Sequence, residues 1–597
     1  MAMPKTVADH ILERLLQWGV RRVFGHPGDG IAGLVAALDR RADKVQFVQA
    51  RHEELAAFMA CGHAKFTGEV GVCIATSGPG AIHLLNGLYD AKLDHQPVVA
   101  IVGQQARTAL GGDYQQEVDL VALFKDVASG FVQMATVAAQ VRHLVDRAVR
   151  IAIEERTVTC LIVPSDLQET AAVEAPPHEH GMLHSGIGAT GRSTMPSETD
   201  LARAASVLNA GERVAILVGA GALHATDELI QVAERLGAGV AKALLGKAVL
   251  PDDLPYVTGS IGLLGTQPSW EMMSQCDTLL MVGSNFPYSE YLPKAGQARG
   301  VQIDIDARRL ALRYPMEVNL VGDSRETLRA LIPHLRRQRD RTWRGRIERD
   351  VQNWWRVMDA RVLNDARPIH PQLVFRELSP RLPEDCILAG DAGSSVFWYA
   401  RDVKIRRGMM ASLSGGLAAL GSAIPYAIAA KHAHPGRHVI AVVSDGAMQA
   451  NGLNGLIAVA RSWKGWATPQ FTMLVLNHTD LNLVRREQRD ATHQPQATDA
   501  PDLPAFAYAG YARRLGLNGI KVDSPADVGA AWHAALVADR PTLVEMVVDA
   551  DAPPVPPHVT GKQVKAYLSA LVKGDPDARN IIVASAREWW DGLFPRR

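Results

Sequence analysis

The feature that most restricts the fold is the alternation of short, β-branched apolar runs with longer helical stretches. Runs such as PVVAIVG, VAILVGAG, TLLMVG and HVIAVVSDG each end in a glycine-bearing turn and lead into a helical segment. Short, continuous apolar runs predict strands that are buried on both faces, as in parallel sheets covered by helices. We therefore expect an α/β fold made of doubly wound parallel sheets.

The chain is too long for one hydrophobic core, since it has 597 residues. A stretch rich in Pro, Gly, His and Ser between residues 175 and 197 predicts a linker. A basic, Trp-containing stretch, RRQRDRTWRGRIERD, leads into a third unit. We expect α/β domains at 1–175, 198–335 and 365–550, followed by a C-terminal tail at 551–597 that opens with APPVPP and becomes helical.

Composition argues against several classes of protein. Lys+Arg and Asp+Glu both number 63, so the formal net charge is zero, and we expect no nucleic-acid partner. The 5 cysteines include no CxxC pair, which argues against a disulfide framework or a zinc site and favours the cytoplasm. The N-terminal segment has charges at helical spacing, as a folded helix does and a signal peptide does not. No apolar run is as long as a membrane span.

Three strand ends in the third domain carry the residues that suggest chemistry. In HVIAVVSDGAMQANGLNGL a buried strand ends at Ser-Asp-Gly and a helix begins, so N–H groups there can bind phosphate while Asp445 holds a divalent cation. A second strand ends at Asn477-His478-Thr479-Asp480, and an upstream strand ends at GDAGSS. An ordinary βα turn explains any one of them. Together, at one sheet edge, they predict a diphosphate and metal site.

The block SDGAMQANGLN…VLNHTDLNLVRREQ resembles the motif that binds thiamine diphosphate (ThDP), which reads Gly-Asp-Gly, about thirty residues, then Asn-Asn. With QARHEELAAFMACGHAKFTG and ATSGPGAIHLLNGLYDAKLDHQP in the first domain, the chain resembles ThDP-dependent enzymes of the pyruvate oxidase and acetolactate synthase group. The resemblance runs from about Thr6 to Arg587. It implies pyrimidine-binding, Rossmann-like middle and diphosphate-binding domains. It also implies a homodimer or homotetramer whose active sites lie between the first domain of one subunit and the third domain of another.

The resemblance assigns Glu53, in Arg-His-Glu, to the glutamate that hydrogen-bonds the aminopyrimidine ring. A carboxyl group there favours the imino tautomer, whose nitrogen can remove the thiazolium C2 proton. Burial between subunits is expected to raise the pKa of this carboxyl group. Taken alone, Glu53 is as well explained as a surface helix residue, like its neighbour Glu54, and only the motif fixes the register.

Other positions follow from the same resemblance. Leu420, in SGGLAALG, matches the apolar residue that holds the cofactor bent, and Gln116 matches a glutamine of the substrate pocket, although its neighbour Gln115 replaces the usual aromatic residue. Leu481 and Val484 are expected to line the same pocket. The remaining cofactor contacts are expected at Pro79, Asn86, Gly393, Ser394, Ser395, Gly416, Asp445, Gly446 and Ala447.

The chain departs from the family pattern at three places. Ser444 replaces the first glycine of the motif, which is tolerable if its backbone angles are open to any residue. His478 replaces the asparagine that, with Asp445 and Asp480, is expected to bind Mg²⁺; imidazole there would weaken the site or shift it toward a transition metal, unless Asn477 substitutes. His26, in FGHPGDG, is either an aid to proton transfer or a polar loop residue.

The middle domain decides whether a second cofactor binds. Gly219-Ala220-Gly221 lacks a third glycine and alone is weak evidence for a nucleotide. With its companions it resembles the FAD-binding domain of pyruvate oxidases and acetolactate synthases, in which Asp304 and Asp323 would accept hydrogen bonds from ribose or adenine. The alternative is a Rossmann-like domain without flavin, and we favour FAD. The companions are Lys247, Gly262, Leu264, Gly265, Gly283, Ser284, Asn285, Asp304, Ile305 and Asp323.

The tail resembles the C-terminal segment of membrane-activated bacterial pyruvate oxidases. Trp589, Trp590, Leu593 and Phe594 lie among arginines, as in an interfacial anchor. Packing against a neighbouring subunit is the alternative that we favour. We therefore expect a cytoplasmic protein, with peripheral contact at the inner membrane face as the second possibility.

These features favour ThDP-dependent decarboxylation of a small 2-oxo acid such as pyruvate, with FAD-linked oxidation of the resulting enamine. In the first alternative, the enamine attacks a second 2-oxo acid, as in an acetolactate synthase, and FAD is structural. In the second alternative, the chain is a catalytically impaired relative that acts as a binding or assembly subunit. Retention of Glu53 and Asp445 argues against the second alternative.

Overall fold

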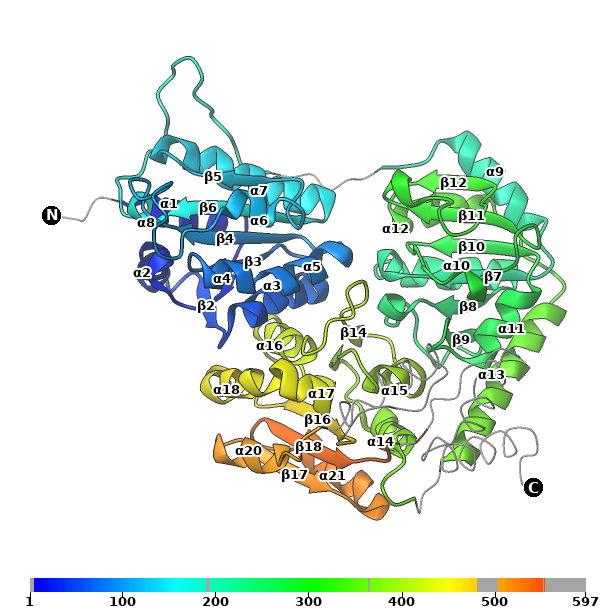
Figure 1. Ribbon diagram of the computed structural model, residues 1–597. Coiled ribbons are helices and arrows are strands. Elements are labelled where there is room, and N and C mark those ends of the chain that lie inside the picture. The colour runs from blue at the N-terminus through cyan, green and yellow to red at the C-terminus, as the bar shows by residue number, and fades with distance from the viewer. Residues whose placement is uncertain (1–4, 189–193, 363–365, 480–502, 551, 553–597) are drawn as a thin grey trace, which may run out of the picture.

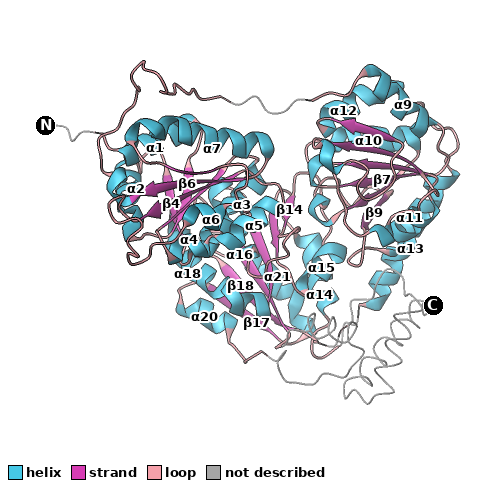
Figure 2. Ribbon diagram, turned by 45° about the horizontal axis from the view of Figure 1, so that its top comes forward, coloured by secondary structure: helices cyan, strands magenta, loops and turns pink. Residues whose placement is uncertain are grey.

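The computed structural model describes residues 5–188, 194–362, 366–479, 503–550 and 552. These residues form three six-stranded sheets in which every pair of neighbouring strands is parallel. Figures 1 and 2 show the sheets as separate bodies with helices packed on their faces. The α/β fold predicted from the apolar runs is confirmed. Each sheet lies inside one of the predicted domain ranges, whose boundaries stay predictions.

The first sheet has the strand order β2-β1-β3-β4-β6-β5. Every residue of its central strands β3, β4 and β6 is buried, because helices cover both faces. The strands are β1 (Arg22–Gly25), β2 (Gln46–Gln49), β3 (Gly71–Ala75), β4 (Val98–Gln104), β5 (Val132–Met134) and β6 (Val158–Pro164). The helices are α1 (Val7–Gln17), α2 (Ala32–Arg40), α3 (Glu53–Thr67), α4 (Pro79–His83), α5 (Leu85–Leu93), α6 (Leu120–Phe124), α7 (Val141–Glu155) and α8 (Ser165–Gln168).

The middle sheet has the order β12-β11-β10-β7-β8-β9. Its strands are β7 (Val214–Val218), β8 (Gly239–Lys242), β9 (Val257–Ser260), β10 (Thr278–Val282), β11 (Arg299–Asp304) and β12 (Val318–Val321). Its helices are α9 (Glu198–Asn209), α10 (Thr226–Leu236), α11 (Gln267–Gln275) and α12 (Ser324–Leu331). The basic stretch after it forms a long helix, α13 (Thr342–Arg361), whose Trp343, Ile347 and Val351 pack into the core of the middle domain.

The third sheet has the order β14-β13-β15-β16-β18-β17. Its strands are β13 (Ile387–Gly390), β14 (Met410–Ser412), β15 (Val439–Ser444), β16 (Phe471–Asn477), β17 (Asn518–Val522) and β18 (Thr542–Val547). Its helices are α14 (Pro371–Leu378), α15 (Ser395–Asp402), α16 (Ala423–Ala433), α17 (Asp445–Ala447), α18 (Leu453–Ser462), α20 (Tyr508–Arg514) and α21 (Val528–Leu536). A π-helical turn at Met448–Gly452 makes α17 and α18 one continuous helical stretch.

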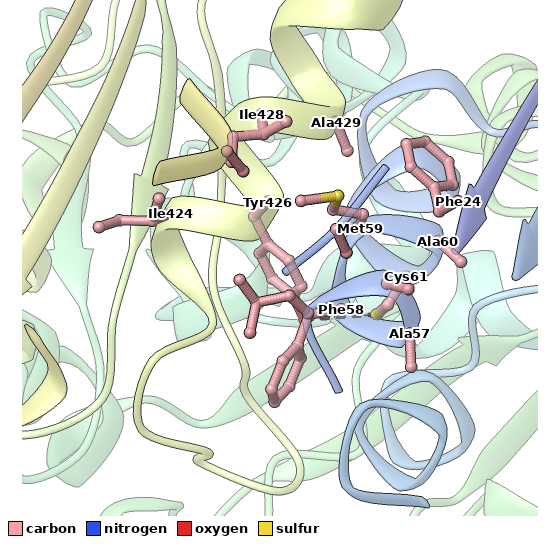
Figure 3. Packing of buried hydrophobic residues seen from close by; sticks show 14 of the residues in the cluster. Phe24, Ala57, Phe58, Met59, Ala60, Cys61, Ile424, Tyr426, Ile428 and Ala429 are labelled. Atoms are coloured by element: carbon pink, nitrogen blue, oxygen red, sulfur yellow. Dashed lines mark hydrogen bonds between the residues drawn. The ribbon is translucent and has the colours of Figure 1, made fainter. Parts of the chain in front are cut away.

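The first and third domains of the chain share one core, in which α3 packs against α16. Figure 3 shows Tyr426 of α16 between Phe58 and Cys61 of α3, and the Tyr426 hydroxyl lies 3.3 Å from Cys61 Sγ. Gly62 allows this close approach, since a Cβ atom there would lie 2.8 Å from Cα of Tyr426. Burial of apolar surface here fixes the two domains relative to each other.

Among the described residues, no helix is long and apolar enough to cross a membrane. Apart from Ala552, the predicted tail at 551–597, with Trp589, Trp590, Leu593 and Phe594, lies outside the described residues.

Candidate active site

Asp445 links the ends of two neighbouring strands of the third sheet. It directly follows β15 and is 2% exposed. Its Oδ1 accepts the N–H of Gly446 at 2.9 Å, and its Oδ2 accepts the backbone N–H of His478, just after β16, at 2.8 Å. The two strand ends that the sequence placed at one sheet edge therefore meet at this carboxylate.

The His478 ring is the most unusual group at this edge. The side chain is 1% exposed, and Nδ1 lies 3.8 Å from Oδ1 of Asp445. Neither ring nitrogen has a hydrogen-bond partner among the residues that the structure describes. The neighbouring Asn477 is oriented by β18, because its Nδ2 donates to Glu545 at 2.9 Å, and its role as a substitute ligand stays a prediction. The expected ligand Asp480 and the expected pocket residues Leu481 and Val484 lie outside the described residues.

Ser444 stands without strain at the position of the motif's first glycine. Its φ of −94° and ψ of 165° are extended backbone that any residue adopts. Gly393, after β13, has a φ of +89°, and a Cβ atom there would lie 3.2 Å from Oγ of Ser444 and 3.4 Å from Leu420. In the same turn, Ser394 precedes α15 and Ser395 begins it; the Ser395 hydroxyl is buried and has no partner within the described part of the chain. The edge fits a ligand rich in hydrogen-bond acceptors.

Asp94, at the C-terminal end of α5, holds the start of the segment that carries Leu420. Its Oδ2 accepts the N–H of Gly415 at 2.9 Å, and its Oδ1 accepts the N–H of Gly416 at 2.6 Å. Lys65 of α3 donates to Oδ2 of Asp94 at 2.5 Å, and both side chains are almost fully buried. The first domain thus positions a segment of the third domain.

Asp391, after β13, holds the other end of that segment. Its two carboxylate oxygens accept the N–H groups of Gly421 and Ala423, each at 2.9 Å. Burial outweighs these hydrogen bonds and raises the pKa of Asp391 to about 7. Leu420 lies between the two anchored ends and is 39% exposed, as a residue that contacts a ligand can be.

Glu53 is the first residue of α3 and is 7% exposed. Its Oε2 lies 3.0 Å from Nδ1 of His83, which donates because an ionised carboxylate can only accept. The His83 ring stacks on His52, with 4.3 Å between the ring centres. Burial raises the pKa of Glu53, but the hydrogen bond from His83 and the charge of nearby His26 outweigh it, so the pKa is lowered. The expected rise concerns a carboxyl group buried between subunits, so it stays a prediction, whereas in the single chain the pKa of Glu53 is lowered.

The other predicted first-domain residues gather around Glu53. Gly78, before Pro79 and α4, has a φ of +60°, and a Cβ atom there would lie 2.8 Å from Cβ of Gln116. Asn86 donates to the carboxylate of Glu54, and Nδ1 of His26 donates to the carbonyl of Ala50 at 3.1 Å. Sequence reasoning missed His83 and His52, although both stand inside the quoted segments RHE and GPGAIH.

The turns after β7 and β10 of the middle domain pack against each other. The N–H of Gly221 donates to the carbonyl of Gly283 at 3.0 Å, and a Cβ atom on Gly283 would lie 2.4 Å from Gly221. Ser284 is buried beside them, and Oδ1 of Asn285 is buried without a partner among the described residues. Such an unpaired amide at strand ends fits a dinucleotide.

The carboxylates expected to bind ribose or adenine lie at the same edge. Asp304 ends β11, before Ile305, and burial raises its pKa. Asp323 caps α12, since its Oδ1 accepts the N–H of Glu326 at 3.0 Å.

Lys247 and its companions join the middle domain to the third domain. Nζ of Lys247 donates to the carbonyl of Ala400 in α15 at 3.0 Å, and burial lowers the pKa of Lys247 to about 8. Arg401 donates to the carbonyl of Gly265 at 3.0 Å, and Leu264 packs against the third-domain core. Gly262 lies in the same loop, with a φ of +96°. Lys247 already has a hydrogen-bond partner in the third domain. A role of these residues in FAD binding stays a prediction.

Comparison with known families finds three consecutive matches. "Thiamine pyrophosphate enzyme, N-terminal TPP binding domain" matches residues 5–123, the "central domain" of these enzymes matches 201–331, and their "C-terminal TPP binding domain" matches 391–546. Thiamine pyrophosphate is ThDP under another name. Each match covers most of the strands of one of the three sheets.

Similar individual proteins cover nearly the whole chain. YdaP of Bacillus subtilis, named as a thiamine pyrophosphate-containing protein, is 34% identical over 99% of this chain and 100% of its own. A pyruvate oxidase of Lactiplantibacillus plantarum is 31% identical over 91% of this chain and 88% of its own. The acetolactate synthase isozyme 2 large subunit of Escherichia coli is 28% identical over 94% of this chain and 100% of its own.

Proposed function

This chain belongs to the ThDP-dependent enzymes, within the pyruvate oxidase and acetolactate synthase group, and we propose that it decarboxylates a small 2-oxo acid such as pyruvate and passes the electrons to FAD. The observation that carries the proposal is the buried Glu53, held by His83 at the edge of the first sheet. When bound, ThDP supplies the carbanion that attacks the ketone and the electron sink for loss of carbon dioxide, and FAD supplies a two-electron acceptor.

Glu53 and His83 provide a path for the proton that this chemistry moves. Glu53 holds a proton toward the aminopyrimidine ring, and the N–H of His83 stabilises the carboxylate once that proton has left. The His83 side chain is 43% exposed, so it can exchange protons with water. A well-placed acid–base group of this kind accelerates a reaction about 10²- to 10⁴-fold.

The edge of the third sheet holds the diphosphate and its cation. The continuous helical stretch that starts at Asp445 directs its N-terminus toward this edge, which favours an anion. The Asp445 carboxylate and the His478 ring are the cation ligands offered by the described residues. Leu420, anchored through Asp94 and Asp391, bends the cofactor.

The middle domain holds FAD through the unpaired amide of Asn285 and the buried carboxylate of Asp304. Oxidation is favoured over carboligation because the relative named pyruvate oxidase is 31% identical, against 28% for the E. coli acetolactate synthase subunit. The second candidate is acetohydroxy acid synthesis with structural FAD, since acetolactate synthases also match over nearly their whole length.

We expect a homodimer or homotetramer in which the Glu53 edge of one subunit faces the Asp445 edge of another. Such an interface would bury Glu53 further, and burial raises the pKa of a carboxyl group. Light scattering on the purified chain measures its oligomeric state. A monomer that retains full activity would contradict the shared site.

Product analysis tests the proposed reaction. The purified chain is given pyruvate, ThDP, a divalent cation and an artificial electron acceptor. We expect carbon dioxide and acetate, with acceptor reduction that requires ThDP. Acetolactate without acceptor reduction would establish the second candidate. No ThDP-dependent loss of carbon dioxide from any small 2-oxo acid would refute both and favour an impaired relative.

A further inference from the structure

The buried ring of His478 needs a partner that the described residues do not supply. Buried polar groups in folded proteins almost always have a hydrogen-bond partner, and both nitrogens of this 1% exposed ring lack one. Leaving such a group unsatisfied is costly, because the hydrogen bonds that it makes to water in the unfolded chain are lost without replacement. The ring is therefore expected to bind a group that arrives with the ligand.

The geometry around the ring fits a metal ion. Nδ1 of His478 and Oδ1 of Asp445 are 3.8 Å apart, too far for a hydrogen bond. Two ligand atoms bound to one ion at about 2.0–2.2 Å each lie within roughly 4.4 Å of each other. Among the described residues, Gly446 is the one donor to Oδ1 of Asp445, which leaves a lone pair for a cation.

The side-chain oxygens described at the end of β16 are already engaged in local hydrogen bonds. The Asn477 amide donates to Glu545 at 2.9 Å, and its Oδ1 faces the N–H of Thr479 at 3.3 Å. The Thr479 hydroxyl donates to the carbonyl of His478 at 2.7 Å. Among the described residues, the side chain that β16 offers to the cation is therefore an imidazole.

We propose that the cation of the diphosphate site is a first-row transition metal ion such as Co²⁺, held by Asp445 and the imidazole of His478. Imidazole nitrogen suits Co²⁺ and the later first-row ions, whereas Mg²⁺ binds oxygen and gives up its water reluctantly. The inference rests on the proposed function, since the ion is expected to bridge the protein to the diphosphate of ThDP.

Metal-dependent cofactor retention tests the inference. The full-length chain is stripped of metal with a chelator and titrated with Co²⁺, Mn²⁺ or Mg²⁺ in the presence of ThDP, and protein-bound ThDP is measured after gel filtration. Any site of this kind prefers Co²⁺ to Mg²⁺ to some degree, so the ratio of their half-saturating concentrations is compared between variants. We expect His478→Asn to reduce this preference for Co²⁺ by about 10-fold or more, as loss of one good ligand should.

The visible absorption of bound Co²⁺ gives a readout that does not depend on activity or on cofactor affinity. We expect the spectrum to change in His478→Asn, because a nitrogen ligand is replaced by oxygen. His438→Asn is the matched control: His438 is also a buried histidine of this sheet, but it precedes β15 at the opposite end and pairs with Thr472 at 3.0 Å. His438→Asn should leave the Co²⁺ spectrum and the ratio of the half-saturating Co²⁺ and Mg²⁺ concentrations unchanged.

The outcomes separate the inference from the proposed function. An unchanged metal ratio and an unchanged Co²⁺ spectrum in His478→Asn would overturn the inference while ThDP binding stands. Failure of the wild-type chain to retain ThDP with any of the three ions would refute the proposed function, and the inference with it. Thermal unfolding of both variants checks that they are folded.

Discussion

Replacing Glu53 with glutamine keeps the shape of the side chain and removes its ability to carry a proton. The side chain is 7% exposed and bonded to His83, and a glutamine carbonyl can still accept that hydrogen bond. The cost to folding should be small: a negative charge in the first turn of a helix contributes about 0.3–1 kcal/mol. The catalytic cost should be far larger, because a general acid–base group accounts for about 10²- to 10⁴-fold in rate, or roughly 3–5.5 kcal/mol.

The assay is ThDP-dependent release of carbon dioxide from pyruvate at saturating ThDP, together with thermal unfolding of the same samples. Glu54→Gln is the matched control, because Glu54 is the next residue of α3, shares the first helical turn, and its carboxylate accepts from Asn86. We expect Glu53→Gln to lose at least 100-fold in rate and Glu54→Gln to stay within about 3-fold of wild type. A Glu53→Gln enzyme with more than about a tenth of wild-type activity, or an equal loss in Glu54→Gln, would refute the assignment.

Three further predictions concern the groups around the site. In His83→Ala, loss of the hydrogen bond that lowers the pKa of Glu53 should move the limb of the pH–rate profile governed by Glu53 to higher pH; an unmoved limb contradicts the pairing. Burial raises the pKa of Asp391 from 3.8 to about 7. The Asp391 carboxyl group therefore contributes to the free energy of unfolding below about pH 4, and this contribution, about 4 kcal/mol, is lost as the pH rises to about 7. Asp391→Asn should flatten the dependence of the free energy of unfolding on pH in that window, and an unchanged slope would contradict the raised pKa of Asp391. In Asp94→Asn, an NH2 group replaces one of the two carboxylate oxygens and faces a backbone N–H donor, so ThDP should bind about 10-fold more weakly, whereas exposed Asp126→Asn should leave the affinity for ThDP unchanged.

The fold was predictable because its signal is local. Strands such as β4, β15 and β16 are mostly apolar and buried throughout, since both sheet faces are covered, and each ends at a polar residue, Gln104, Ser444 or Asn477. The meeting of Asp445 with His478 followed from the same signal, because the carboxyl ends of neighbouring parallel strands share one edge.

Contacts between distant segments could not be predicted in this way. The bond of His83 to Glu53 depends on how the turn at Gly78 aims α4 at the start of α3, and sequence spacing does not encode that angle. Lys247 was grouped with the nucleotide-binding glycines by family resemblance, which gave no sign that its ammonium donates to Ala400 in another domain. The lowered pKa of Glu53 was missed for the same reason, since its cause is a neighbour brought close by folding.

The visible absorption spectrum of the purified chain, recorded without oxygen before and after addition of pyruvate, tests the central claim most directly. We predict flavin bands that bleach when pyruvate, ThDP and a divalent cation are all present, and that persist when ThDP is left out. Flavin bands that persist with all components, or a protein that holds no flavin at all, would contradict FAD-linked oxidation of a 2-oxo acid.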